Sequence, residues 1–120
     1  MSTSDTCCTV VPYFKVHEGQ MEIVQALCQQ MVETTSNESG ALYYGFSFDG
    51  DEVHCREGYE DAAGVLAHPE NIGPLLQQML QVADLTRLEV HGPAEQLDEL
   101  RGPLDEMDPQ FFTLQFGFRR

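Results

Sequence analysis

The sequence predicts an α+β fold in which strands and helices follow one another in the order βαββαβ. Apolar residues alternate on both sides of an Asp49-Gly50 dipeptide, and this pattern is typical of a β-hairpin. Apolar residues at helical spacing come before the hairpin and again after it. Because crossover connections are right-handed and sequential strands prefer to be neighbours, this order predicts a ferredoxin-like sheet with helices on one face.

The first strand and the first helix are expected within residues 9–40. Residues 9–17 are rich in β-branched and aromatic residues, and Pro12 among them favours an edge strand or a strand start. Gly19 ends this strand, and an amphipathic helix follows and stops in the polar run 34–40. The apolar stripe of the helix consists of Met21, Val24, Leu27, Cys28, Met31 and Val32.

The hairpin is expected to place polar and aromatic side chains on one face of the sheet. An even number of loop residues pairs even positions with odd positions across the hairpin, which fixes the residues that share a face. That face carries Tyr44, Phe46, Cys55, Glu57 and Tyr59. A carboxylate and two phenols therefore point the same way from a mostly apolar surface.

Two helices are expected between the hairpin and the fourth strand. Asp61 is placed to cap a short helix that runs through Leu66, and Pro69 limits its continuation. A second helix follows, with an apolar stripe of Ile72, Leu75, Leu76, Met79 and Leu80. Residues 83–91 then return to a strand pattern, which ends at Gly92.

A further helix and a C-terminal strand extend the βαββαβ order. Pro93 opens the helix, whose inward residues are Leu97, Leu100 and Leu104. Residues 111–118 form the last strand, with Phe112, Leu114, Phe116 and Phe118 on one face. We expect residues 9–120 to be a single domain and residues 1–8 a flexible tail. Because helices cover only one face, we expect a homodimer that packs sheet against sheet and uses the C-terminal strand.

Composition narrows the partners and the compartment. Six basic residues against twenty acidic ones give a formal net charge of -14, which repels nucleic acid and anionic membranes. No run of apolar residues is long enough to span a membrane, and the first residues lack the features of a signal peptide, so we expect a cytoplasmic protein. The four cysteines form no CxxC pair, so we expect no metal; Cys28 and Cys55 are interpreted as small buried hydrophobic residues.

Taken in order, several segments resemble the antibiotic biosynthesis monooxygenase-like group, over about residues 9–118. They are VPYFKV with Gly19, SGALYYGF, REGYEDAAGVLAH, and LEVHGP before AEQLDELRGPL. The resemblance implies a dimeric α/β barrel with a pocket between each sheet and its helices. Quinone-forming members carry an Asn and a Trp on the third strand, and Cys55 and Tyr59 hold those places here. Haem-degrading members use a His on the helix after that strand, an Asn on the first strand and a Trp. This chain has no Trp and no Asn in its first strand, so we expect no cofactor and rank a haem-binding monooxygenase third among the alternatives.

Glu57 and His68 are the candidate catalytic residues. Burial would raise the pKa of Glu57 and suit it to take a proton from a phenol or enol. The alternative is an ion pair with Arg87 or Arg101. His68 could exchange a proton near neutral pH, or it could instead bond the free carbonyls at the end of a helix.

Tyr44, Tyr59 and Cys55 are the candidate substrate-binding residues, although inward aromatic residues also serve simply as core. Two hypotheses for the function follow. The first is a cofactor-independent monooxygenase-like enzyme acting on a small aromatic phenol or quinol. The second is a non-catalytic dimer of the same fold that binds a small apolar or aromatic ligand, because a fold does not by itself confer a function.

Overall fold

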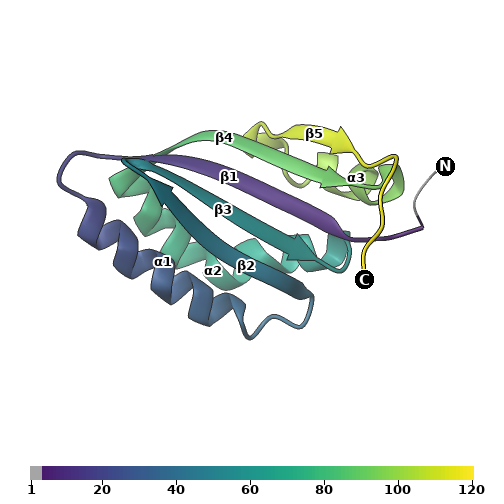
Figure 1. Cartoon of the computed structure of the whole chain (residues 1–120), viewed down its shortest axis with the longest axis horizontal. Helices are drawn as coiled ribbons and strands as arrows, with labels where there is room; N and C mark the ends of the chain where they lie inside the picture. The colour runs from purple at the N-terminus through teal and green to yellow at the C-terminus, as the bar shows by residue number, and fades with distance from the viewer. Residues whose placement is uncertain (1–3) are drawn as a thin grey trace.

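In a computed structural model that describes residues 4–120, the chain forms a five-stranded sheet with helices on one face (Figure 1). The elements in chain order are β1 (Cys8–Val16), α1 (Met21–Thr35), β2 (Ala41–Asp49), β3 (Glu52–Tyr59), α2 (Ala62–Val82), β4 (Ala83–Gly92), α3 (Ala94–Arg101), the 3-10 helix η1 (Asp105–Met107) and β5 (Gln110–Thr113). The predicted ferredoxin-like βαββαβ order, with an added helix and a C-terminal strand, is confirmed.

The strand order is β2-β3-β1-β4-β5, so β1 lies in the middle of the sheet. The edge position predicted from Pro12 is therefore wrong. Pro12 is paired with Leu88 of β4. On the β3 side, the pairing is interrupted between Val10 and Tyr13, so Pro12 has no partner there. The ring nitrogen that cannot donate thus falls at a gap in the β1–β3 pairing. Cys8 already belongs to β1 and is fully buried, and residues 1–3 of the predicted tail lie outside the described residues.

The β2–β3 hairpin has the predicted facing. Its loop contains two residues, and Gly50 in that loop has a φ of 60°, which favours glycine. Tyr44 is paired with Glu57, and Phe46 is paired with Cys55. Phe46 packs against buried residues of α1 and α2, and Cys55 and Glu57 are buried, so both pairs lie on the side of the sheet that the helices cover.

Helix α2 is a single helix, not the two shorter helices predicted from Pro69. Both Pro69 and Pro74 lie inside it. Its buried residues share one stripe, and they include Val65, His68, Ile72 and Met79. An internal proline costs about 3 kcal/mol, and burying one large apolar side chain returns about 1.5–3 kcal/mol. A continuous stripe packed against the sheet can therefore keep the helix intact through both prolines.

The C-terminal strand is shorter than predicted. β5 pairs in parallel with β4 only as far as the partners Gly92 and Thr113. Beyond them β4 has ended, so the chain has no strand to pair with, and it continues as an irregular segment. Phe116 and Phe118 are consequently 71% and 81% exposed. Near the end of the chain, Arg119 Nε lies 3.0 Å from a carboxylate oxygen of Asp5.

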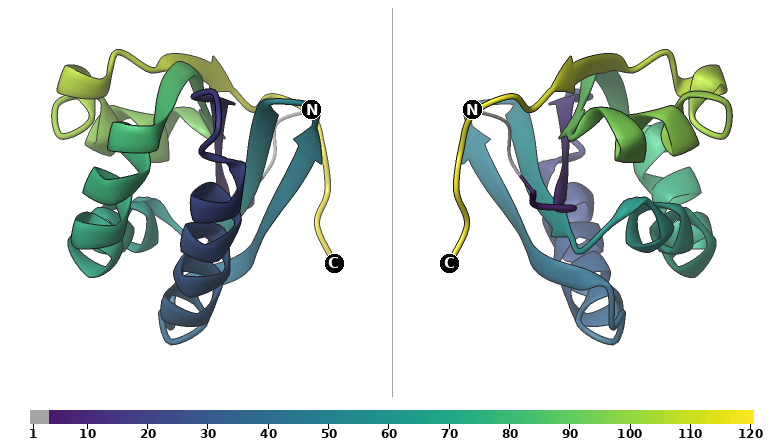
Figure 2. Two further views of the ribbon diagram at one scale, coloured as in Figure 1. Left: turned by 90° about the vertical axis from the view of Figure 1, so that its left-hand side faces the viewer. Right: turned by 90° about the vertical axis from the view of Figure 1, so that its right-hand side faces the viewer.

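All three α-helices lie on the same side of the sheet (Figure 2). The core between the two layers is divided into two clusters. One cluster joins α3 and the start of α2 to the sheet: Cys8, Tyr59, Ala62, Val65, Val90, Leu97, Leu100 and Leu104. The other joins α1 and the end of α2 to it: Phe14, Val16, Val24, Leu27, Cys28, Val53, Met79 and Ala83. No helix in residues 4–120 is long and apolar enough to cross a membrane.

A close backbone contact fixes the loop after α1 against the first turn of α2. A Cβ atom added to Gly40 would lie 3.0 Å from the Cα atom of Gly64. The carbonyl oxygen of Gly40 also accepts a hydrogen bond of 2.9 Å from the backbone N–H of Glu60. The absence of a side chain at Gly40 therefore allows the loop and the helix to approach.

We expect Gly40→Ala to lower the free energy of unfolding by about 1–3 kcal/mol, because backbone must move to admit the new methyl group. Urea unfolding measures this change. Gly102→Ala is the matched control, because Gly102 has a helical φ of -67° and no atom within 4 Å of an added Cβ. The control should be neutral or slightly stabilising. Equal stability of both variants would contradict the close-contact explanation.

Candidate active site

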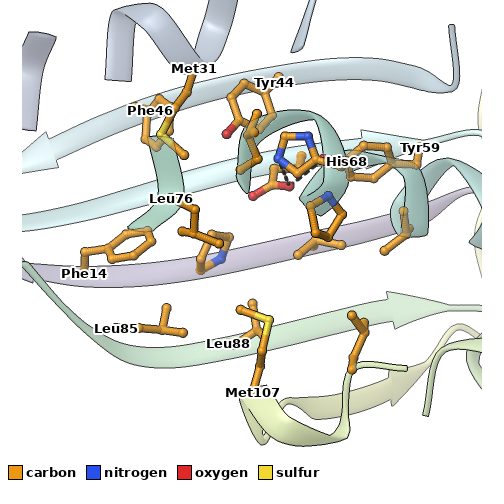
Figure 3. Close-up of a pocket in the computed structure, with 17 residues that line it drawn as sticks. Phe14, Met31, Tyr44, Phe46, Tyr59, His68, Leu76, Leu85, Leu88 and Met107 are labelled. Carbon is orange, nitrogen blue, oxygen red and sulfur yellow. Dashed lines mark hydrogen bonds and ion pairs between the residues drawn. The ribbon is translucent and has the colours of Figure 1, made fainter. Parts of the chain in front are cut away.

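A pocket lies between the sheet and the helices, with lining residues drawn from both core clusters. Seventeen residues line it, and its free volume is about 70 Å³ (Figure 3). Four of them are polar: Tyr44, Glu57, Tyr59 and His68. The others are aliphatic, aromatic, methionine or proline side chains, and none is Lys or Arg. The polar groups therefore form one small cluster on an apolar wall.

Glu57 occupies the centre of this cluster. It lies on β3, faces the helices and is 5% exposed. Its Oε1 atom accepts a hydrogen bond of 2.6 Å from the hydroxyl of Tyr59, two residues along the same strand. The same oxygen lies 3.6 Å from Nε2 of His68. The buried carboxyl thus has one hydroxyl donor and one imidazole beside it.

The alternative ion pairs of Glu57 do not form. Arg87 pairs with Glu89, and Arg101 lies 3.7 Å from Asp98. Arg87 belongs to the opposite face of the sheet, since it alternates with the inward residues of β4. The alternative proposed for Glu57 is therefore wrong, and an imidazole takes the place of the guanidinium.

His68 reaches Glu57 because α2 places it on the buried stripe. Asp61 caps this helix as predicted, and its Oδ1 accepts a hydrogen bond of 2.9 Å from the N–H of Gly64. His68 lies well inside the helix and is 6% exposed, so it does not bond carbonyls at a helix end as the alternative supposed. Its ring packs between those of Tyr44 and Tyr59, with centroid distances of 5.1 and 5.5 Å.

The second nitrogen of His68 contacts a residue that the sequence analysis did not single out. His68 Nδ1 lies 2.9 Å from Oε2 of Glu38, in the loop between α1 and β2. The amide nitrogen of Asn71 donates to the same oxygen at 2.8 Å. Glu38 comes from the polar run that marks the end of a helix, and a contact across 30 residues leaves no local signal in the sequence.

Burial sets the protonation states of the cluster. Desolvation raises the pKa of Glu57, and the neighbouring His68 and the hydroxyl of Tyr59 oppose this shift. Desolvation, reinforced by the nearby Glu57, also raises the pKa values of Tyr44, Tyr59 and Cys55. The phenols and the thiol therefore stay protonated at neutral pH, and proton exchange falls to Glu57 and His68.

The candidate binding residues differ in their access to the pocket. Tyr44 and Tyr59 both line it, although the hydroxyl of Tyr59 is already engaged with Glu57. Cys55 is 1% exposed and is not one of the lining residues. Within residues 4–120, no group of three or more His, Cys, Asp or Glu side chains is arranged to hold a metal ion.

Comparison with solved structures places this arrangement among known folds. The crystal structure of MupZ from Pseudomonas fluorescens superposes with a TM-score of 0.93 at 49% sequence identity, covering 97% of this chain and 96% of that one. A putative antibiotic biosynthesis monooxygenase from Nitrosomonas europaea gives a TM-score of 0.70 at 12% identity, covering 78% and 96%. A putative antibiotic biosynthesis monooxygenase from Chloroflexus aurantiacus gives 0.62 at 16% identity, covering 73% and 93%. No protein-family model matches the sequence, and no curated protein matches it.

Because the pKa of Glu57 is raised in the folded protein, the free energy of unfolding should fall as the pH rises. The unfolded chain, with a carboxyl pKa near 4.5, loses this proton before the folded protein does. The protonated Glu57 therefore contributes its full stabilisation below the pKa of the unfolded chain. This contribution is lost as the pH rises through the pKa of Glu57 in the folded protein. Glu57→Gln cannot ionise, so its free energy of unfolding should fall less than that of the wild type as the pH rises above about 4.5.

Chemical unfolding at several pH values measures this slope. Glu52→Gln is the control, because Glu52 lies on the same strand with an exposed side chain and should keep the wild-type slope. If Glu57→Gln also kept that slope, the folded pKa of Glu57 would not be raised.

Proposed function

Since this chain belongs to the same family as MupZ and shares its fold with proteins of the antibiotic biosynthesis monooxygenase-like group, we propose that it is a cofactor-independent monooxygenase-like enzyme acting on a small aromatic phenol or quinol. One observation carries the proposal. The buried carboxyl of Glu57 lies between the hydroxyl of Tyr59 and Nε2 of His68, inside an otherwise apolar pocket. A buried acid beside an imidazole is the equipment needed to move a proton without water.

Glu57 and His68 form the proton acceptor. The 3.6 Å between Glu57 Oε1 and His68 Nε2 is short enough for one substrate hydroxyl to contact both atoms. The proton taken from that hydroxyl is then shared by the pair. Apolar walls exclude water, so the substrate anion is not stabilised by solvent and remains reactive.

The oxidation itself needs only the substrate anion and dioxygen. The phenolate gives an electron to dioxygen, and the two radicals combine to form a C–O bond. The O–O bond then breaks as water leaves and the ring becomes a quinone. One phenol and one dioxygen thus give one quinone and one water, without an external reductant. The proton held by Glu57 and His68 is returned to the departing oxygen.

The two tyrosines take different roles in this proposal. Tyr59 holds Glu57 in place through its 2.6 Å hydrogen bond and is not free to orient the substrate. Tyr44 lines the pocket next to His68 and stands on the opposite side of the ring from Tyr59 in Figure 3. Tyr44 has Thr35 and Cys55 as its hydrogen-bonding neighbours, and in this proposal its hydroxyl turns to orient the substrate oxygen. Cys55 hydrogen-bonds with Glu57 and Tyr44 from outside the pocket lining, so its predicted role in binding is to hold these two side chains.

Two features of the pocket limit the substrate. The free volume of about 70 Å³ is about half the ~150 Å³ of a cavity that holds benzene, so even a single ring requires the side chains to move. No Lys or Arg lines the pocket, so the site offers no permanent cation for a carboxylate or phosphate. A small neutral phenol or quinol requires the least movement of the side chains and no such cation.

The alternative is a dimer that binds a small ligand without turning it over. The small free volume and the engaged hydroxyl of Tyr59 favour it. In that case Glu57 and Tyr59 are a satisfied polar pair in the core. The predicted homodimer, formed through the open sheet face and the C-terminal segment, belongs to both proposals.

Oxygen uptake with a panel of small phenols and quinols tests the enzyme proposal. We expect uptake by the wild type and a loss of about 10²–10⁴-fold in kcat/KM for Glu57→Gln and for His68→Ala, the usual contribution of a general base. Glu52→Gln is the matched control on the same strand and should retain activity. Carboxylated analogues of an active phenol should react poorly.

Calorimetric titration of the same panel separates the alternatives. Uptake that survives both substitutions would overturn the roles of Glu57 and His68. Binding of panel members without oxygen uptake would overturn the monooxygenase proposal and support the binding protein. Neither binding nor uptake would overturn both.

A further inference from the structure

The carboxylate of Glu38 is buried although it belongs to a loop. Its side chain is 8% exposed, the same as that of His68. Oε2 lies 2.9 Å from His68 Nδ1, and Oε1 lies 3.2 Å from the same nitrogen. Asn71, one turn further along α2, donates to Oε2 at 2.8 Å. A buried carboxylate in a loop is costly unless its oxygens are bonded, and here both are.

Backbone hydrogen bonds hold Glu38 in this position. Its N–H donates to the carbonyl of Thr35 at 2.9 Å, and its carbonyl accepts from Ala41 at 3.2 Å. Asn71 reaches across to the same loop, where it also donates to the carbonyl of Thr34 at 3.2 Å. The Gly40–Gly64 contact fixes the loop against α2 from the other side. The carboxylate therefore approaches His68 from a braced position.

This contact determines which nitrogen of His68 carries the fixed proton. An ionised carboxylate can only accept, so Nδ1 must donate to Glu38. Nε2 is then the nitrogen that faces Glu57. The groups around the ring are two carboxyls, Glu38 and Glu57, two phenols, Tyr44 and Tyr59, and the amide of Asn71. No Lys or Arg is paired with any of them in the described residues.

We propose that Glu38, oriented by Asn71, is a positioning residue that fixes the Nδ1-protonated tautomer of His68 and leaves Nε2 to exchange a single proton with Glu57. In the first arrangement His68 and Glu57 are both neutral, so Nε2 is an acceptor and the carboxyl of Glu57 is a donor. In the second arrangement the proton is on Nε2 and Glu57 is ionised. The total charge of Glu38, His68 and Glu57 is the same in both arrangements, so the proton can move without burying an additional charge.

The catalytic consequence rests on the proposed function, whereas the tautomer does not. The ring nitrogens of protein labelled with ¹⁵N-histidine can be observed directly by NMR. The signals of His68 are assigned by their loss in His68→Gln, since the chain has three other histidines. We expect a protonated Nδ1 and an unprotonated Nε2 for neutral His68 in the wild type.

Glu38→Gln removes the charge, and Glu33→Gln is the matched control. Glu33 lies at the end of α1, five residues before Glu38, and its side chain is exposed. A neutral amide accepts the hydrogen bond from Nδ1–H less strongly than an anion does, so the fraction of the Nδ1-protonated tautomer should fall in Glu38→Gln and stay constant in the control. A mixture of tautomers should also appear in Glu38→Ala, which has no acceptor at this position.

Activity provides a second readout. If neutral His68 takes the proton, the acidic limb of the kcat/KM profile should move to lower pH in Glu38→Gln. The plateau should fall about 10- to 100-fold through kcat, because a weaker and less oriented base transfers the proton more slowly. Asn71→Ala keeps the carboxylate and should shift the limb in the same direction by a smaller amount.

The outcomes separate the two proposals. An unchanged tautomer of His68 in both Glu38→Gln and Glu38→Ala would overturn the positioning role. If the Glu38 variants do not fold, Asn71→Ala and the wild type provide the test. The positioning role would be overturned if neutral His68 of the wild type were protonated on Nε2 and Asn71→Ala left this tautomer unchanged. A fixed Nδ1 tautomer in a protein that consumes no oxygen would support this inference while the monooxygenase proposal fails.

Discussion

The burial of one carboxyl group constrains the rest of the site. Glu57 points from the sheet into the layer that the helices cover, where an unpaired carboxylate would be strongly destabilising. Tyr59 and His68 meet this requirement at 2.6 and 3.6 Å. His68 in turn needs a partner for Nδ1, and Glu38 supplies it. The network of polar groups thus extends from β3 through α2 to the loop after α1. Each buried group in it is a polar partner of the one before.

The architecture keeps this polar chain in an apolar enclosure. Two hydrophobic clusters anchor the helices at the two ends of the sheet, and the pocket takes lining residues from both. Because the two clusters hold the layers together at either side of the pocket, the space between them need not be completely filled. The Gly40–Gly64 contact adds a second constraint, since it sets the distance between the loop of Glu38 and the helix of His68.

The C-terminal part of the chain completes one wall of the pocket. Leu104 and Met107 line it from the segment that follows α3. The match to MupZ covers 97% of this chain, whereas the matches to the two putative antibiotic biosynthesis monooxygenases cover 78% and 73%. More than a fifth of the chain therefore has no counterpart in those two structures.

Short-range patterns in the sequence determined the order of elements, the facing of the hairpin and the cap at Asp61, because alternation, turn type and capping act over a few residues. They therefore predicted that Glu57 and Tyr59 share one face of the sheet, and the structure shows that the helices cover this face. Tertiary structure decided the rest. Packing against the sheet carried α2 through Pro69, the end of β4 left Phe116 without a strand partner, and a contact across 30 residues joined Glu38 to His68. These outcomes depend on contacts between elements that are distant in the sequence, so no local sequence pattern could predict them.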